Sequence, residues 1–275
     1  MFEKRNLPYG KKTKTGYSTD TAVLEELVFS TNDPLPKMIL DYRSYTKLQS
    51  TYVEALPLLA DKNGRIHTSF LQTGTATGRL SSRDPNLQNI PVRDESGRRI
   101  RSAFTAVPKT VLISADYSQI ELVVLAHLSG DKNLCSAFIN GIDVHKSTAA
   151  LIYGISPEQV KPEQRRFAKT VNFGVMYGMS AFRLANELNI SRTEAKNFID
   201  QYFSTYSDVK KFLDETKRMA RENGYVETIT GRRRYIPEIK SSSKIVLQGA
   251  ERIAINTPIQ GSADRKSTRL NSSHT

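Results

Sequence analysis

The sequence predicts an α+β fold that is rich in helices, with short strands separated by a large helical insertion. Three observations lead to this prediction. Residues 65–73 alternate in polarity and are rich in strand-forming side chains, and residues 111–116 form an apolar run that ends in a carboxylate, as in a buried strand. Between about 119 and 222, apolar residues recur at helical spacing. Residues 225–236 then have the pattern of a hairpin that turns at Gly231.

Capping residues and apolar spacing together predict the helices. Ser18-Thr19-Asp20 precedes the first helix, Gly130 ends another, and Ser156-Pro157-Glu158-Gln159 is a capping box. The segment 74–91 is expected to be irregular, because Gly and Pro interrupt it. Helices are expected at residues 20–28, 34–60, 119–129, 132–139, 144–153, 162–188, 192–205 and 207–222, and from 244 onward.

Length and composition bound the class of protein. The 275 residues allow one large domain or two modest ones. A single cysteine, Cys135, excludes an internal disulfide framework and a multi-cysteine zinc site. No apolar run approaches the roughly 18 residues that span a bilayer. The net charge of +12 indicates a polyanionic partner such as nucleic acid, although many basic proteins bind none.

Four residues spaced by four lie along one side of the helix predicted at 162–188: Arg165, Lys169, Phe173 and Tyr177. Two cations followed by two aromatic rings suit a nucleoside triphosphate, with the cations at the phosphates and a ring at the base or sugar. The alternative is an ordinary amphipathic helix with solvated charges.

The same helix has a second stripe, suited to anchor it to a core: Phe167, Val171, Val175 and Phe182. Gly174 and Gly178 also lie in this predicted helix, and each glycine inside a helix lowers its stability by about 1 kcal/mol. Either the close approach of a large ligand or tight helix packing would explain them.

Asp116 ends the predicted buried strand, where a carboxylate is costly unless it meets a cation or hydrogen-bond donors. In a protein that handles phosphates the cation would be Mg²⁺, which prefers oxygen ligands. A helix cap or a salt bridge is the alternative for Asp116, and a solvated helix charge is the alternative for Glu121.

The stretch 75–91 is dense in amide and hydroxyl groups, with Arg79 and Arg93 at its edges. Such groups suit phosphate, sugar and minor-groove contacts, and they also suit simple loops.

Five segments, in this order, resemble the family A DNA polymerases, in particular the bacterial members. The resemblance covers residues 1–263 and rests on TATGRLSSRDPNLQNIPVR (75–93), DYSQIEL (116–122), RRFAKTVNFGVMYGMSAF (165–182), GRRRYIPEI (231–239) and ERIAINTPIQGSA (251–263).

This resemblance implies a right-hand polymerase architecture, with a partial palm that contains an antiparallel sheet, helical fingers and a remnant of the thumb. The expected subdomains are the thumb remnant (1–36), the first part of the palm (37–130), the fingers (131–240) and a helix that returns into the palm (241–263). Residues 264–275 are expected to be a non-native tail that resembles the translation of a sequencing-adapter oligonucleotide; a solvated native tail is the alternative. The implied setting is the bacterial cytoplasm at the nucleoid, as a monomer that does not bind a membrane.

The implied activity is template-directed DNA synthesis, in which a dNTP is added to the 3′-hydroxyl of a primer with two Mg²⁺ ions. By similarity, Asp116 and the backbone carbonyl of Tyr117 would ligate the metal, and Arg165, Lys169 and His145 would contact the triphosphate.

Further roles follow from the same resemblance. Glu121 would be the steric gate against a ribose 2′-hydroxyl, Phe173 would pack on the incoming nucleotide, and Tyr177 would hold the insertion site. Gln119 belongs to the same nucleotide-binding set. Arg79 and Gln260 would contact the minor groove of the primer–template. The duplex and the active-site wall would be supported by Asn86, Gln88, Asn89, Arg93, Arg252 and Asn256.

The sequence also departs from the family. It has no His-Asp-Glu segment, which in the family carries the second palm carboxylate, and residues 1–36 resemble only the later part of a thumb. We therefore expect a fragment that is catalytically inactive by itself. A DNA-binding module without catalysis and a single-subunit RNA polymerase are the alternatives, and Glu121 argues against the second.

Overall fold

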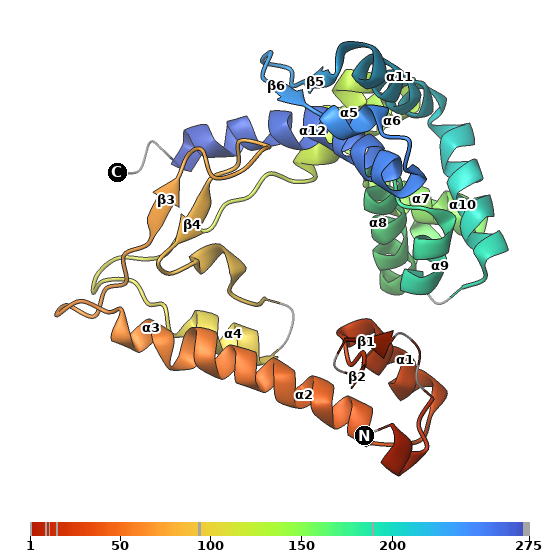
Figure 1. Ribbon diagram of the computed structural model, residues 1–275. Helices are drawn as coiled ribbons and strands as arrows, with labels where there is room; N and C mark the ends of the chain where they lie inside the picture. Colours follow the sequence, from red (N-terminus) through yellow and green to blue (C-terminus); the bar gives the residue numbers. More distant parts are fainter. Residues whose placement is uncertain are drawn as a thin grey trace. The chain divides into compact units, whose positions relative to one another are not determined.

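The computed structural model describes residues 2–8, 10, 12–14, 16–92, 95–188 and 190–271, with side chains up to Ala263. The chain forms two compact units (Figure 1). Unit 1 comprises residues 1–71 and 81–113, and unit 2 comprises residues 72–80 and 114–275. The fold is mostly helical with small antiparallel sheets, as the sequence predicts. No helix in the described ranges is long and apolar enough to cross a membrane.

Unit 1 begins with a small subcore of its own. Its first elements are η1 (Glu3–Arg5), β1 (Lys12–Thr13), β2 (Gly16–Tyr17) and α1 (Thr21–Ser30). The predicted cap is confirmed, because the side chain of Asp20 accepts a hydrogen bond from the backbone N–H of Val23 at 3.0 Å. Leu24 and Leu27 of α1 are buried against Phe2 and Leu7.

The helix predicted over 34–60 forms in three pieces, α2 (Leu35–Leu48), a π-helical turn η2 (Gln49–Val53) and α3 (Ala55–Leu58). They are followed by β3 (Ser69–Leu71), β4 (Ser81–Arg83), η3 (Leu87–Asn89) and α4 (Glu95–Ser102). β3 and β4 pair antiparallel, with Phe70 opposite Ser82. The hydroxyl of Tyr52 donates to the backbone oxygen of Asn89 at 2.6 Å, which ties η2 to η3.

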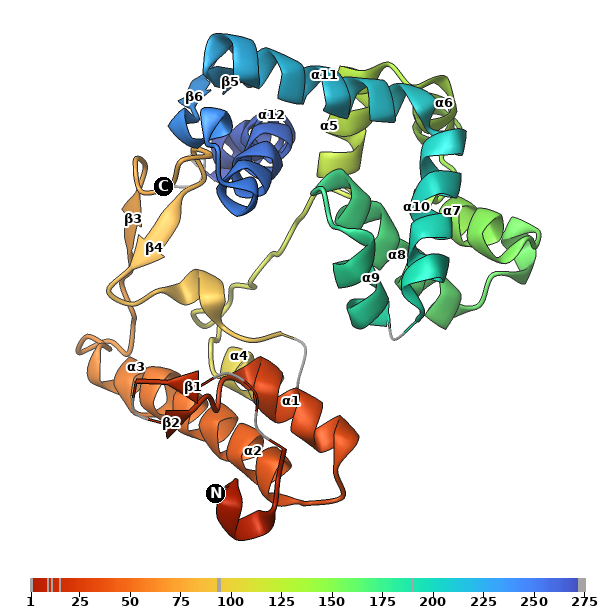
Figure 2. The same ribbon diagram turned by 45° about the vertical axis from the view of Figure 1, so that its right-hand side comes forward.

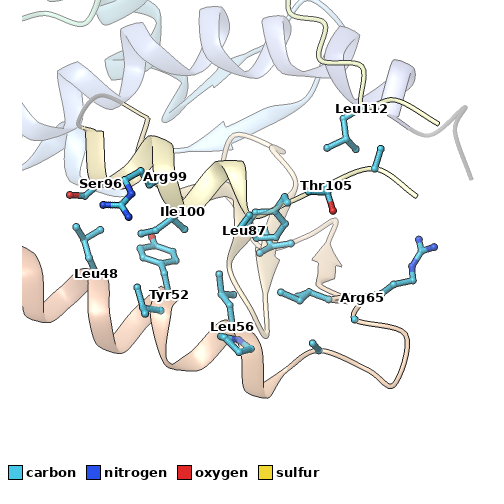
Figure 3. A pocket seen from close by; sticks show the side chains of 18 of the residues that line it. Leu48, Tyr52, Leu56, Arg65, Leu87, Ser96, Arg99, Ile100, Thr105 and Leu112 are labelled. Atoms are coloured by element: carbon cyan, nitrogen blue, oxygen red, sulfur yellow. The ribbon is translucent and has the colours of Figure 1, made fainter. Parts of the chain in front are cut away.

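Unit 1 contains a cavity of about 1070 Å³ (Figure 3). The cavity is lined by the apolar side chains of Leu48, Tyr52 and Leu56 on one side and by Ile100 of α4 on the opposite side. Arg99, also on α4, adds a positive charge to the lining.

Unit 2 confirms most of the predicted helices. Its elements are α5 (Ile120–Ser129), α6 (Lys132–Ile139), α7 (Val144–Tyr153), η4 (Pro157–Gln159), α8 (Pro162–Met176), α9 (Ala181–Leu188), α10 (Arg192–Thr205), α11 (Ser207–Asn223), β5 (Tyr225–Glu227), β6 (Arg233–Tyr235), η5 (Pro237–Lys240) and α12 (Lys244–Asn271). The hairpin at 225–236 is confirmed by the antiparallel pairing of β5 with β6. Apolar side chains of α5, α8 and their neighbours form the core of unit 2. α7 and α8 pack against each other, and Figure 2 shows both in one group of helices with α9 and α10.

The single helix predicted over 162–188 is wrong. It is divided into α8 and α9, because the chain turns at Gly178, whose φ is +68°. A Cβ atom at Gly178 would lie 2.7 Å from Cδ1 of Ile255, and one at Gly174 would lie 3.1 Å from the sulfur of Met179. Both glycines are therefore explained within the protein by tight packing. Phe182 lies beyond the turn and is 61% exposed, so it does not anchor the helix.

The buried strand predicted over 111–116 is also wrong. These residues are irregular and exposed, with Ile113 at 87%. A strand needs a neighbour to satisfy its backbone groups, and the described part of the chain places no paired strand beside this segment. The strand predicted over 65–73 is confirmed only for Ser69–Leu71.

The subdomain boundaries remain predictions. The division into two units falls inside the predicted palm at residues 113 and 114, and it groups the loop 72–80 with the later part of the chain. The backbone of α12 continues through Asn271, into the segment assigned to a non-native tail, and the origin of that tail stays a prediction.

Candidate functional site

The carboxylate of Glu121 is the centre of a polar cluster in unit 2. Glu121 lies in the first turn of α5 and its side chain is only 14% exposed. Nη2 of Arg79, from the loop 72–80, donates to Oε1 of Glu121 at 2.7 Å. The hydroxyl of Tyr177, at the end of α8, donates to Oε2. Both carboxylate oxygens are therefore occupied, and the side chain of Glu121 is fixed.

The environment of Tyr177 keeps its hydroxyl protonated. Burial raises the pKa of Tyr177, and the hydrogen bond to the Glu121 carboxylate raises it further. Gln260 of α12 lies beside Tyr177 and acts on its pKa in the opposite direction. Glu121, Tyr177, Arg79 and Gln260, four residues predicted from separate segments, are thus brought together.

Two further predicted residues lie on the Gln260 side of α12. Arg252, Asn256 and Gln260 are spaced by four, which places them along one side of the helix. Arg252 is exposed. Oδ1 of Asn256 is buried and has no hydrogen-bond partner among the described residues.

Arg79 is positioned by the way in which the loop 72–80 packs. Arg232, at the turn between β5 and β6, donates from Nη1 to the backbone oxygen of Thr77. Its guanidinium group occupies the space beside Gly78, so that a side chain at Gly78 would collide with it. Gly78 has a φ of +87°, which also favours glycine. Arg232 therefore holds the loop at Thr77 and Gly78, the two residues that precede Arg79.

The predicted stripe on α8 is confirmed as a side-by-side arrangement. Nζ of Lys169 lies 5.9 Å from the ring centroid of Phe173, and the rings of Phe173 and Tyr177 stack with centroids 6.2 Å apart. Arg165 stands one turn before Lys169, and its Nε donates to Oδ2 of Asp143 at 2.6 Å.

Asp143 is a residue that the sequence analysis missed. Its Oδ1 accepts from the backbone N–H groups of His145 and Lys146, so that it caps α7 while Oδ2 binds Arg165. Burial raises the pKa of Asp143, but the hydrogen bonds from Arg165 and Lys146 outweigh it and leave the pKa below its usual value. An Asp that precedes a helix signals a cap, but not a partner for Arg165.

His145 is almost completely buried, with 2% of its surface exposed. Burial lowers its pKa to about 4, and the charges of Arg165 and Lys169 contribute to this shift. At neutral pH the imidazole is therefore uncharged. In the chain without a nucleotide His145 can offer a hydrogen bond but no charge, and its role toward a triphosphate stays a prediction.

A small cavity of about 340 Å³ brings Gln119 and Arg165 to one place. It is also lined by Ser118, Asp143 and Phe138. Gln119 has a φ of +54°, and its Oε1 is buried without a hydrogen-bond partner in the described structure. The cavity is polar on the side of Gln119 and Arg165, and it could receive an anionic or polar group.

Asp116 and Tyr117 lie on the exposed irregular segment that precedes α5. The burial that was expected to demand a cation at Asp116 is therefore absent. Among the residues that the structure describes, no group of three or more His, Cys, Asp or Glu side chains could hold a metal ion. One carboxylate and one backbone carbonyl do not fit a site for two divalent ions.

The amide residues predicted to support DNA lie in unit 1 around η3. Ser82 donates from Oγ to Oδ1 of Asn86 at 3.0 Å and from its backbone N–H to Oε1 of Gln88 at 3.1 Å. The backbone oxygen of Asn89 accepts from Tyr52. These groups stabilise the loop itself, and a role toward DNA stays a prediction. Arg93 lies outside the described residues.

Comparison with known proteins gives a consistent result. The family model for DNA polymerase family A matches residues 1–265. DNA polymerase I of Treponema pallidum is 54% identical over 263 residues, which cover 96% of this chain and 26% of that protein. The thermostable DNA polymerase I of Thermus thermophilus is 54% identical over 266 residues, which cover 96% of this chain and 32% of that protein.

A solved structure is also similar, the POL domain of Pol1 from M. smegmatis in complex with DNA primer-template and dNTP. It has a TM-score of 0.86 and 46% sequence identity, over 96% of this chain and 47% of that chain. The chain thus spans about a quarter to a third of the length of the two DNA polymerase I relatives. With a family match that extends over nearly all of its length, the chain belongs to DNA polymerase family A.

Proposed function

We propose that this chain contains the nucleotide- and template-binding part of a bacterial DNA-directed DNA polymerase. The whole enzyme would transfer a nucleotide from a dNTP to the 3′-hydroxyl of a primer. The observation that supports this most strongly is the arrangement along α8, where Arg165 and Lys169 precede two stacked rings and the last ring reaches Glu121. A nucleotide has phosphates at one end and a sugar and base at the other, in the same order.

Each side chain would have a defined task in binding. Arg165 and Lys169 would bind the phosphates by charge-assisted hydrogen bonds, and Phe173 would pack on the nucleotide. The Glu121 carboxylate, fixed by Arg79 and Tyr177, would leave no room for a ribose 2′-hydroxyl. Gln119 would line the same pocket beside Arg165.

The duplex would be contacted by donors on the loop 72–80 and on α12. Arg79 and Gln260 would donate to the minor groove, where every base pair presents acceptors at similar positions. Arg252 and Asn256, on the same side of α12 as Gln260, would extend this surface. In unit 1, Asn86, Gln88, Asn89 and Arg93 would make separate contacts with DNA.

The cofactor of the whole enzyme would be Mg²⁺, with Asp116 and the carbonyl of Tyr117 among its ligands. Because the described residues supply a single carboxylate there, this chain by itself would bind dNTP and DNA without catalysis. That makes a binding module without catalysis the second candidate for the isolated chain. The proposed setting is the bacterial cytoplasm at the nucleoid, with the protein as a monomer.

Binding of dTTP and of a labelled primer–template, measured by fluorescence anisotropy and calorimetry on the full chain, tests this proposal. Lys169→Ala should weaken dTTP binding about tenfold, since a charge-assisted hydrogen bond contributes about 1.5–3 kcal/mol. Lys196→Ala on α10 removes the same charge from an exposed position of another helix and should change little. Equal effects of the two substitutions would contradict the proposed site, and efficient primer extension by the chain would contradict its inactivity.

A further inference from the structure

We propose that Asn172 and Thr148 are positioning residues that hold His145 as a neutral imidazole protonated at Nε2, so that it offers a hydrogen-bond donor to the triphosphate. This inference rests on the proposed function, because it assigns the way in which one residue of that site would meet its substrate. It concerns residues that the sequence analysis did not single out.

The contact between Asn172 and His145 is buried and short. Nδ2 of Asn172, on α8, lies 2.8 Å from Nδ1 of His145, on α7. Oγ1 of Thr148, one turn after His145 on α7, donates to Oδ1 of Asn172 at 2.9 Å. Asn172 and Thr148 have no exposed surface, and His145 has 2%. Buried polar groups of this kind need partners, so the network has little freedom to rearrange.

The direction of the hydrogen bonds determines the tautomer. Since Thr148 gives its only hydrogen to Oδ1 of Asn172, the amide turns its NH₂ group toward His145. Nδ1 of His145 must then be an acceptor without a hydrogen, and in a neutral imidazole the hydrogen is left on Nε2. Hydrogen bonds therefore run in one direction, from Thr148 through Asn172 to His145.

Burial is the main reason that the pKa of His145 is low. The charge of Asp143, at the start of α7, acts in the opposite direction, and the charges of Arg165 and Lys169 on α8 lower the pKa further. The ring of Phe173 lies 5.7 Å from the imidazole, centroid to centroid, and adds no charge. In the chain without a nucleotide His145 is thus neutral at pH 7, as the hydrogen-bond direction requires.

Long-range ¹⁵N–¹H NMR on the ¹⁵N-labelled full chain tests the tautomer without any nucleotide. The chain has four histidines, and His145→Gln identifies the signal of His145. We expect a hydrogen on Nε2, a bare Nδ1 and a pKa of about 4. A hydrogen on Nδ1 would overturn the proposal, because it requires the hydrogen bonds to run in the opposite direction.

Two substitutions test whether the network sets this state. Asn172→Asp replaces the donor by a carboxylate of the same shape and should move the hydrogen to Nδ1 and raise the pKa of His145 to about 6.5 or above. Thr148→Val removes the hydroxyl with little change in volume and should yield a mixture of the two tautomers. Circular dichroism verifies that each variant is folded, and Ser136→Ala on α6 is a control outside the network. Unchanged tautomer and pKa in both folded variants would refute the positioning role.

Titration with dTTP separates this inference from the proposed function. Wild type should bind with a clear change in the chemical shift of Nε2–H of His145. His145→Leu, which has no donor, should bind about fivefold more weakly, as expected for the loss of one hydrogen bond. Binding of dTTP at Lys169 with no change at His145 would overturn the donor role and leave the proposed function intact. Absence of dTTP binding would overturn the proposed function and the donor role with it.

Discussion

Removal of the charge of Asp143 should strengthen triphosphate binding, because Asp143 and a phosphate compete for Arg165. Nε of Arg165 lies 2.6 Å from Oδ2 of Asp143, and the two side chains are 43% and 33% exposed. An ion pair that is this accessible to water stabilises the protein by only about 0.2–1 kcal/mol. Release of Arg165 in Asp143→Asn should therefore tighten triphosphate binding by about 1.4- to 5-fold.

The choice of Asn separates the charge of Asp143 from its cap. Oδ1 of Asp143 accepts from the backbone of His145 and Lys146, and the amide oxygen of Asn can accept the same two bonds. Asp143→Asn should therefore keep the stability of α7, whereas Asp143→Ala should lose about 1 kcal/mol of unfolding free energy. Chemical denaturation measures both differences.

Calorimetric titration with dTTP and with inorganic tripolyphosphate measures the gain in affinity. Asp214→Asn, on α11, raises the net charge by the same amount at an exposed ion pair on another helix. The reasoning is refuted if Asp143→Asn binds no more tightly than wild type, or if Asp214→Asn gains as much. Since the pKa of Asp143 lies below its usual value, the advantage of Asp143→Asn should persist as the pH falls to about 4 and disappear only where Asp143 itself is protonated.

Three further outcomes are expected. Glu121→Ala should abolish discrimination between rNTP and dNTP in binding titrations, since it removes the fixed carboxylate; an unchanged ratio of affinities would contradict the assigned gate. Gly178→Ala should lower the unfolding free energy by about 1–2 kcal/mol, because φ is +68° and a Cβ atom would lie 2.7 Å from Ile255. Gly249→Ala, inside α12 with only a 4.0 Å contact, should leave the unfolding free energy unchanged or raise it by up to about 1 kcal/mol. Equal losses of stability in Gly178→Ala and Gly249→Ala would contradict the steric explanation for Gly178. The affinity for primer–template DNA should fall steeply between about 50 and 200 mM salt, and a flat response would mean that the basic surface does not bind the phosphates.

Local signals predicted most of the helices of unit 2. The capping box that begins at Ser156 and the glycine that follows α5 are local signals of this kind, and both are found where they were predicted. The strand at 111–116 could not be judged in this way, because strand formation depends on a pairing partner elsewhere in the chain. The break at Gly178 was missed, since glycine in a periodic stretch is compatible with a helix until the packing of Ile255 is known.

The sequence predicts which site residues lie next to each other on one helix, but it does not predict which residues of different segments are partners. Spacing by four placed Lys169 and Phe173 correctly, since both belong to α8. The bond between Arg79 and Glu121 joins residues 42 apart, and the pair of Asp143 and Arg165 joins residues 22 apart. Such partners are set by tertiary packing, and no local pattern specifies them.

One dNTP should bind along α8, with its phosphates at Arg165 and Lys169 and its sugar beside Glu121. A crystal structure of the full chain with dTTP and primer–template DNA would reveal where the nucleotide lies. We expect triphosphate oxygens within hydrogen-bond distance of both cations and the deoxyribose against the Glu121 carboxylate. A nucleotide bound away from α8, with Arg165 still paired to Asp143, would contradict this expectation.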